Sequence, residues 1–305
     1  MPATTARAPG TLHPHDRRTV TNPVAAAVRR HPIAAYYILA FAISWGAIVL
    51  AVGPDGFLAT GDTIAVAGSV SLAGPTVAGI LVTTLTEGLS GLRRLASRLR
   101  QWRVGARWYA VALLTGPLVM GTTVTAFSLV SEKFRPDFAT ADDKASMVIA
   151  GIAGGIAVGA FEELGWTGVA LPRLRARFGV PATGLLMGLL WSVWHFPFFA
   201  ETSDPEGTVP QGLLVVVLLF AWLPPYRLLM VWLYDRTGSL PLAMLMHAPV
   251  TAGALILATE DASGSATLIQ VLAWGAVYWA ILGVVAWANG GRLTRRHDGL
   301  QSPSP

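Results

Sequence analysis

The chain has 305 residues, of which 53% are hydrophobic and only 13% are charged. Soluble domains carry about 25% charged residues, so this composition excludes a water-soluble protein and indicates a membrane protein. The net charge of +5 does not indicate nucleic-acid binding, because the basic residues lie between apolar segments. The absence of cysteine excludes disulfides, thiol nucleophiles and cysteine-bound metals.

The two ends of the chain differ from its middle. Residues 1–32 are polar and basic and contain no apolar run, so they do not form a cleaved signal peptide. We predict a disordered basic cytoplasmic tail over 1–32, a membrane domain over 33–288 and a second cytoplasmic tail over 289–305. The motifs discussed below place the functional core of the membrane domain at about 145–255.

The membrane domain contains a series of apolar segments long enough to cross a bilayer. A transmembrane helix needs about 20 apolar residues, and about eight such segments predict an all-α, polytopic helical bundle. Leu171–Pro172 predicts the end of the fourth, and Pro224–Pro225 predicts a break or kink in the sixth. The predicted spans are 33–53, 64–86, 108–130, 146–170, 181–199, 212–234, 239–258 and 267–288.

Charge alternates between successive loops. The loop 87–107 holds six arginines, whereas acidic residues predominate in loops 131–145 and 200–211. The positive-inside rule therefore predicts a multi-pass protein of the plasma membrane with both termini and the 87–107 loop in the cytoplasm. The two acidic loops are then expected outside.

Five ionisable side chains lie inside the predicted spans, at Glu162, Glu163, His195, Arg227 and His247. An ionisable residue inside a membrane span costs several kcal/mol on insertion scales, so each is a candidate for function. Counted along their helices, the glutamates and histidines fall in one layer, about a third of the way in from the cytoplasm. We expect one water to bridge Glu162 and the two histidines.

This set of side chains is suited to activating water. A carboxylate in a low-dielectric site acts as a general base, and an imidazole shares the water or donates to a developing oxyanion. We predict no cofactor; the alternative is a zinc ion held by Glu162, His195 and His247. A glutamate pair is also found in proton-coupled carriers, but the absence of an internal repeat counts against a carrier.

The sequence around these residues resembles the CPBP family, the CAAX-protease and bacteriocin-processing (Abi) intramembrane endopeptidases. The family motif E-E-x-x-x-R corresponds to Glu162–Thr167. The second motif, an aromatic residue followed four positions later by histidine, corresponds to Trp191–His195, and the third, H-x-x-x-N, to His247–Thr251. Residues 102–109 and 232–240 are also similar to the family, and weaker likeness extends to most of the membrane domain.

The resemblance implies catalytic roles for these residues. Glu162 is expected to polarise the attacking water with His195 as its partner, and Glu163 to support Glu162. His247 and Thr251 are expected to stabilise the oxyanion. The implied function is hydrolysis of a peptide bond near the cytoplasmic face, in a peptide or membrane-protein substrate within the lipid bilayer and without nucleic acid. The alternative is a non-catalytic immunity or scaffold protein with the same fold.

Two residues depart from the family motifs. Thr251 replaces the asparagine of the third motif, and Thr167 replaces the arginine of the first. Because residue i+4 stacks on residue i in a helix, Thr167 leaves Glu163 without a local cation. Arg227, at the same estimated depth, is expected to pair with Glu163; the alternative is that Arg227 extends to the headgroups. Trp166, inside the first motif, is a supporting candidate.

Overall fold

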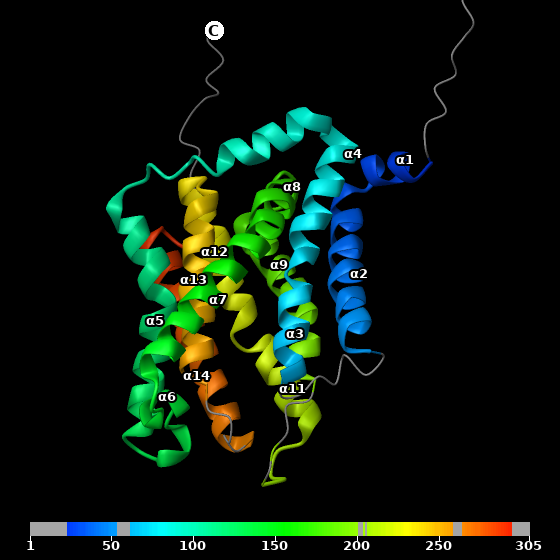
Figure 1. The fold of residues 1–305 in the computed structure, drawn as a ribbon. Coiled ribbons are helices and arrows are strands. Elements are labelled where there is room, and N and C mark those ends of the chain that lie inside the picture. Colours follow the sequence, from blue (N-terminus) through cyan, green and yellow to red (C-terminus); the bar gives the residue numbers. More distant parts are fainter. Residues whose placement is uncertain (1–22, 54–61, 201–203, 205, 259–263, 295–305) are drawn as a thin grey trace, which may run out of the picture.

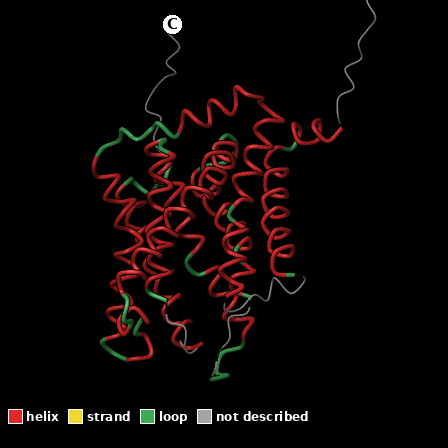
Figure 2. The backbone as a smooth tube through the Cα atoms, viewed as in Figure 1, coloured by secondary structure: helices red, strands yellow, loops and turns green. Residues whose placement is uncertain are grey.

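The computed structural model describes residues 23–53, 62–200, 204, 206–258 and 264–294. Within these residues every regular element is helical (Figures 1 and 2). Six helical segments are long and apolar enough to cross a membrane, and Val180–Trp194 and Leu240–Ile256 are shorter apolar helices. The prediction of an all-α, polytopic membrane bundle is confirmed.

The helices follow the predicted spans in order. Some spans consist of two helices with a break between them. The membrane helices are α2 (Pro32–Val52), α3 (Asp62–Ser71) followed by α4 (Ala73–Arg98), α5 (Ala106–Ser128), α7 (Lys144–Gly165) followed by α8 (Leu171–Arg175), α9 (Val180–Trp194), α11 (Gln211–Phe220) followed by α12 (Leu223–Thr237), α13 (Leu240–Ile256) and α14 (Gly264–Ala288). Shorter helices are α1 (Pro23–Arg30), α6 (Asp137–Thr140) and α10 (Phe196–Phe199), with a 3₁₀ turn at Glu132–Phe134.

Residues 23–30 form helix α1, so the prediction of disorder is wrong for this part of the tail. Pro23 begins the helix, where its missing N–H is not needed, and three consecutive alanines favour helix. Arg29 and Arg30 lie at the negative end of the helix dipole, and Val28 is buried. Residues 1–22 and 295–305 of the predicted tails lie outside the described residues.

The fourth span does not end at Pro172, contrary to the prediction. Trp166–Ala170 form a π-helical turn, and the chain continues as α8 with Pro172 in its first turn. In the π turn the N–H of Leu171 bonds to the carbonyl of Trp166, five residues back. The ordinary hydrogen-bond pattern is therefore already interrupted where proline enters, which removes the usual cost of its missing N–H.

Two other breaks shape the bundle. α11 ends before Ala221, and Pro224 and Pro225 occupy the first turn of α12, which confirms the predicted break in the sixth span. α4 continues to Arg98, beyond the predicted end at residue 86, and turns at Gly88. Gly88 has φ 62° and ψ −156°, a conformation that only glycine adopts readily. The segment after Gly88 crosses over the ends of other helices (Figure 1).

The two ends of the bundle carry opposite charge. The basic face is the end formed by α1, the part of α4 after Gly88, and α8, at the top of Figure 1; the acidic face is the end with α6, at the bottom. Most of the arginines belong to the basic face: Arg29, Arg30, Arg93, Arg94, Arg98, Arg100, Arg103, Arg107, Arg173, Arg175, Arg177 and Arg236. The acidic face carries Glu132, Asp137, Asp142, Asp143, Asp204 and Glu206.

Helix α7 approaches α13 very closely because glycines face it at every fourth position. Gly151, Gly155 and Gly159 are all buried. A Cβ at Gly155 would lie 2.3 Å from the carbonyl oxygen of Ala248, and one at Gly159 would lie 2.6 Å from that of Met244. This close packing brings the next turn of α7, which carries both glutamates, against α13.

Candidate active site

Glu163 is fully buried and accepts hydrogen bonds from three other side chains. Nη1 of Arg227 lies 2.8 and 2.9 Å from its two carboxylate oxygens. Nδ1 of His247 lies 2.7 Å from Oε1, and the hydroxyl of Thr167 donates to Oε2. Glu163 therefore links α7 to α12 and α13, and the predicted pair between Arg227 and Glu163 is present.

Arg227 does not extend to the headgroups, because its side chain is only 1% exposed. Its guanidinium carbon lies 4.2 Å from the centroid of the Trp191 ring. Nε and Nη2 have no hydrogen-bond partner among the described residues. The face of the Trp191 ring is thus the main compensation for this part of the buried cation.

Glu162 is held by two indole groups. Its Oε2 accepts hydrogen bonds from Nε1 of Trp166 at 3.1 Å and from Nε1 of Trp191 at 2.9 Å. Trp166 lies one turn further along the same chain segment, whereas Trp191 comes from α9. Both donors are uncharged and almost completely buried, so they fix the orientation of the carboxylate without neutralising it.

His195 follows the last residue of α9 and is held by its own helix. Its Nδ1 lies 2.8 Å from the carbonyl oxygen of Trp191. A carbonyl oxygen only accepts hydrogen bonds, so Nδ1 carries the proton and Nε2 of the neutral ring is free to act as a base. The ring packs edge-on against Trp191 and Trp194 and stacks on Phe199.

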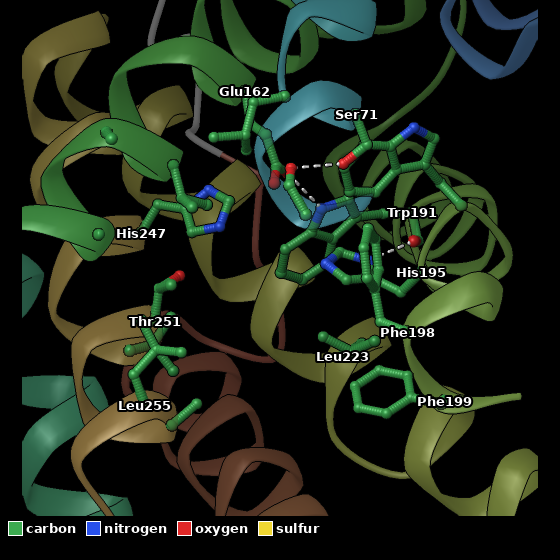
Figure 3. A pocket seen from close by; sticks show the side chains of 18 of the residues that line it. Ser71, Glu162, Trp191, His195, Phe198, Phe199, Leu223, His247, Thr251 and Leu255 are labelled. Atoms are coloured by element: carbon green, nitrogen blue, oxygen red, sulfur yellow. Dashed lines mark hydrogen bonds between the residues drawn. The ribbon is translucent and has the colours of Figure 1, made fainter. Parts of the chain in front are cut away.

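A cavity of about 570 Å³ brings the site residues together. Glu162, His195, His247 and Thr251, from α7, α9 and α13, all line it, and Figure 3 shows these four side chains around one space. Glu163 does not line the cavity. The remaining walls are mostly apolar, with contributions from Leu72, Val158, Phe198, Phe199, Trp222, Leu223, Val250, Ala254 and Leu255.

The structure therefore separates the two glutamates that the sequence placed in one group. Glu162 faces the cavity, whereas Glu163 lies behind it and bonds to His247 and Arg227. Neither histidine faces lipid: His247 is 1% exposed, and His195 lines the cavity. The sequence did not predict that Trp191 bonds to Glu162. Its spacing from His195 indicates a motif but gives no partner for its indole N–H.

The alternative of a zinc ion held by Glu162, His195 and His247 stays a prediction. Among the described residues, no group of three or more His, Cys, Asp or Glu side chains could hold a metal ion. Oε2 of Glu162 is directed to two indoles, and Nδ1 of His247 is directed to Glu163. In metal sites too, a ligating histidine donates its other ring N–H to a carboxylate or a carbonyl oxygen, so these bonds are compatible with either alternative.

Known proteins match this part of the chain. A family model described as type II CAAX prenyl endopeptidase Rce1-like matches residues 144–253, the segment from α7 into α13 that contains the three motifs. This segment is similar to the Rce1-like CAAX protease family. The resemblance inferred from Glu162, His195 and His247 is thereby confirmed.

A curated relative supports the same assignment. CAAX prenyl protease 2 of Methanococcus maripaludis is 31% identical to this chain over 104 residues. The aligned part amounts to 33% of this chain and 38% of the relative, so the chain matches well under half of the relative's length. The similarity to this family therefore holds for the matched segment.

Proposed function

We propose that this chain is an intramembrane endopeptidase, similar to CAAX proteases, that hydrolyses a peptide bond with water activated by Glu162 and His195. The observation that carries the proposal is that Glu162, His195 and His247 come from three helices to line one cavity inside an apolar bundle. The match of this segment to a family of proteases supports it.

The proposed reaction begins with a water between Glu162 and Nε2 of His195. The carboxylate of Glu162 takes a proton from the water, and at the same time the oxygen of the water attacks the carbonyl carbon of the scissile bond. The C–N bond of the tetrahedral intermediate then breaks, and the same proton passes to the leaving amine. The two indoles that bond to Glu162 keep its carboxylate aimed at the cavity throughout.

The oxyanion of the intermediate is proposed to be stabilised from α13. Thr251 lies one turn from His247 on the cavity wall, so its hydroxyl donates one hydrogen bond. Nδ1–H of His247 is directed to Glu163, so the other ring nitrogen, Nε2, faces the oxyanion. When the ring is doubly protonated, Nε2–H donates the second hydrogen bond to the oxyanion. Glu163 and Arg227 act through His247 and are positioning residues.

The depth of the site supports hydrolysis in the half of the membrane nearer the basic face. His247 is the eighth residue of α13, about 10 Å along the helix from Leu240 at the basic end. The charge difference between the two faces supports a cytoplasmic basic face, with the chain in the plasma membrane. No metal ion takes part in the proposed reaction.

The test compares wild-type protein with Glu162→Gln in proteoliposomes. A pool of apolar peptides is added, and the products are identified by mass spectrometry. Because a general base contributes about 10²–10⁴-fold, Glu162→Gln is expected to lower the cleavage rate by at least 100-fold. Glu132→Gln, which removes an exposed carboxylate from the acidic face, is the matched control and should leave the rate unchanged.

Two results would reject the proposal. The first is cleavage by Glu162→Gln at the rate of wild type. The second is a folded wild-type protein that cleaves none of the peptides, which would favour the non-catalytic immunity or scaffold protein.

A further inference from the structure

Residues 89–107, the crossing segment, lie across the basic end of the bundle between α4 and α5 (Figure 1). The inner side of this segment packs on the π turn after α7. Leu95 is 7% exposed, and a Cβ on Gly168 would lie 2.7 Å from its Cδ1. Three residues further, Nη1 of Arg98 donates to the carbonyl oxygen of Gly168 at 2.6 Å. The helical part of the segment therefore has one face on the bundle and the other face directed away from it.

The crossing segment lies at the level of the lipid headgroups. It leads into α5, which begins at Ala106 and has 23 residues. A helix of this length extends about 34 Å, slightly more than the ~30 Å hydrocarbon core of a bilayer. The first turn of α5 is therefore at one edge of that core, and the crossing segment before it lies along the membrane surface.

The outer side of the crossing segment is basic and has no countercharge of its own. No aspartate or glutamate occurs between residues 88 and 131. Glu87, just before the segment, already bonds to Arg94 and Arg173. Several exposed arginines form no ion pair among the described residues: Arg93, Arg100, Arg103 and Arg107. Such an excess of one charge favours an anionic partner.

Large apolar side chains are exposed among these arginines. They include Leu89, Leu99 and Trp102. The guanidinium carbon of Arg103 lies 5.3 Å from the centroid of the Trp102 ring, and that of Arg107 lies 5.0 Å from the centroid of Trp108. Tryptophan is enriched at the headgroup level, and helices that combine basic and apolar side chains lie in the membrane interface. This mixture favours a lipid surface over a soluble acidic protein.

We propose that the crossing segment is a binding surface for anionic phospholipids of the adjoining leaflet. The unpaired arginines bind the phosphate groups, since a guanidinium donates two parallel hydrogen bonds to a phosphate. The exposed leucines and Trp102 insert between the lipids. Each arginine near an anionic membrane surface strengthens the attraction about fivefold. This surface is separate from the proposed catalytic residues, and its test does not depend on catalysis.

Lipid enrichment at the segment is measured by energy transfer, with the full chain in nanodiscs of phosphatidylcholine and a minor share of phosphatidylglycerol. The chain has no cysteine, so one introduced cysteine carries the only donor dye. Ser97→Cys places the donor on the exposed side of α4, and Thr140→Cys places it on α6 at the acidic face. The acceptor dye is attached to an acyl chain of either phosphatidylglycerol or phosphatidylcholine.

At Ser97→Cys, energy transfer to phosphatidylglycerol is expected to be at least twofold that to phosphatidylcholine. At Thr140→Cys the ratio should be one or lower, because the acidic face repels anionic lipid. Salt at 1 M reduces the Debye length to about 3 Å and should bring the ratio at Ser97→Cys close to one. A ratio of one at Ser97→Cys in low salt would overturn the proposal.

The contribution of the arginines is tested by charge removal. Three exposed arginines are changed together: Arg93→Gln, Arg100→Gln and Arg103→Gln. The matched control removes the same charge at the acidic face: Lys133→Gln, Arg135→Gln and Lys144→Gln. The first triple variant should lose most of the enrichment, and the control should keep it. Equal enrichment in the two would overturn the role of these arginines. The comparison of low and high salt uses no charge-removal variant, so it decides the proposal even where a triple variant does not fold.

Two soluble competitors distinguish lipid from other anions. Glycerol 3-phosphate carries the headgroup charge without acyl chains, and polyglutamate represents an acidic protein. Enrichment of phosphatidylglycerol should persist with millimolar amounts of either one, because neither provides contacts for the exposed leucines. Loss of the enrichment with glycerol 3-phosphate would assign the surface to free phosphate groups. Loss with polyglutamate would assign it to an acidic protein, and either result would overturn the proposal of a lipid surface.

Discussion

Arg227 and Glu163 form a buried ion pair between α12 and α7, with Nη1 within 2.9 Å of both carboxylate oxygens. In the family motif the arginine stands at the position of Thr167, one turn from Glu163 on the same helix. Here the cation comes from another helix, and the hydroxyl of Thr167 donates to the same carboxylate. The charge of the motif is therefore kept while its place in the chain has changed.

The first prediction is that Arg227→Ala and Glu163→Ala each destabilise the protein by about 3–5 kcal/mol, because each leaves an unpaired buried charge. The double variant should lose less than the sum of the two, by more than about 1 kcal/mol. Denaturation in detergent micelles measures all three values. Strictly additive losses would contradict direct pairing.

A compensating variant gives the control for this prediction. Thr167→Arg restores the family motif and should recover part of the stability lost by Arg227→Ala. The same Thr167→Arg in the wild-type background puts two cations at one carboxylate and should lower stability. Equal effects in the two backgrounds would show that the two arginines do not share Glu163.

The order of the spans and the common depth of the ionisable residues could be predicted from sequence. The ion pair between Arg227 and Glu163 shows why. A buried cation in an apolar span requires an anion, and helix geometry places Arg227 and Glu163 at one depth. Helix α1 and the extension of α4 past Gly88 were missed because both lie at the basic end, where hydropathy gives no signal.

The details of the site were less accessible to sequence reasoning. The helix period places Glu162 and Glu163 about 100° apart around the axis of α7, but it does not show which of them faces the cavity and which faces Arg227. The bond from Trp166 to Glu162 follows the i, i+4 spacing and could have been found.

The second prediction concerns the indole of Trp191. Trp191→Phe keeps an aromatic face for Arg227 but removes the N–H that donates to Glu162. A hydrogen bond to a charged group contributes about 1.5–3 kcal/mol, so kcat/KM should fall by about 10- to 100-fold. Trp102→Phe, at an exposed tryptophan on the basic face, should have no effect. An unchanged kcat/KM for Trp191→Phe would show that this bond does not position the carboxylate.

The third prediction addresses Thr251. Thr251→Asn restores the family motif and offers a longer donor to the oxyanion, so kcat should rise. Thr251→Val keeps the shape but removes the hydroxyl, and kcat should fall by about 10-fold or more. Single-turnover rates on one peptide compare the two variants. If Thr251→Val retains the wild-type rate, the oxyanion is stabilised without this residue.

The fourth prediction concerns Asp204 at the acidic face. The backbone N–H of Gly264, together with Thr208, Val209 and Glu206, bonds to this carboxylate and holds its pKa below the ordinary value. A lowered pKa in the folded state means that Asp204 stabilises the protein above pH 4 and loses this effect as the pH falls further. Asp204→Asn should therefore lower the melting temperature at pH 7.

The difference between wild type and Asp204→Asn should narrow between pH 5 and pH 3. Melting curves at these pH values measure it, with Asp142→Asn, at an exposed aspartate of the same face, as the control. A constant difference across the range would show that the charge of Asp204 is not what holds its backbone and residues 206–209 to the start of α14.

The last prediction tests whether the approach of α7 to α13 sets the geometry of the site. A Cβ at Gly159 would lie 2.6 Å from the carbonyl oxygen of Met244 and 3.1 Å from the amide nitrogen of Ala248. These are backbone atoms, so Gly159→Ala must push the helices apart and lengthen the bond between Glu163 and His247. Both the melting temperature and kcat/KM should fall.

Gly121→Ala on α5 is the matched control, because nothing lies within 4 Å of the added Cβ. Alanine is more stable than glycine inside a helix by about 0.5–1 kcal/mol, so this variant should melt slightly higher and keep its activity. If Gly159→Ala behaves like Gly121→Ala, then α7 and α13 accommodate the added Cβ without moving apart. The placement of His247 against Glu163 would in that case depend on the side-chain hydrogen bonds alone, and not on the glycines of α7.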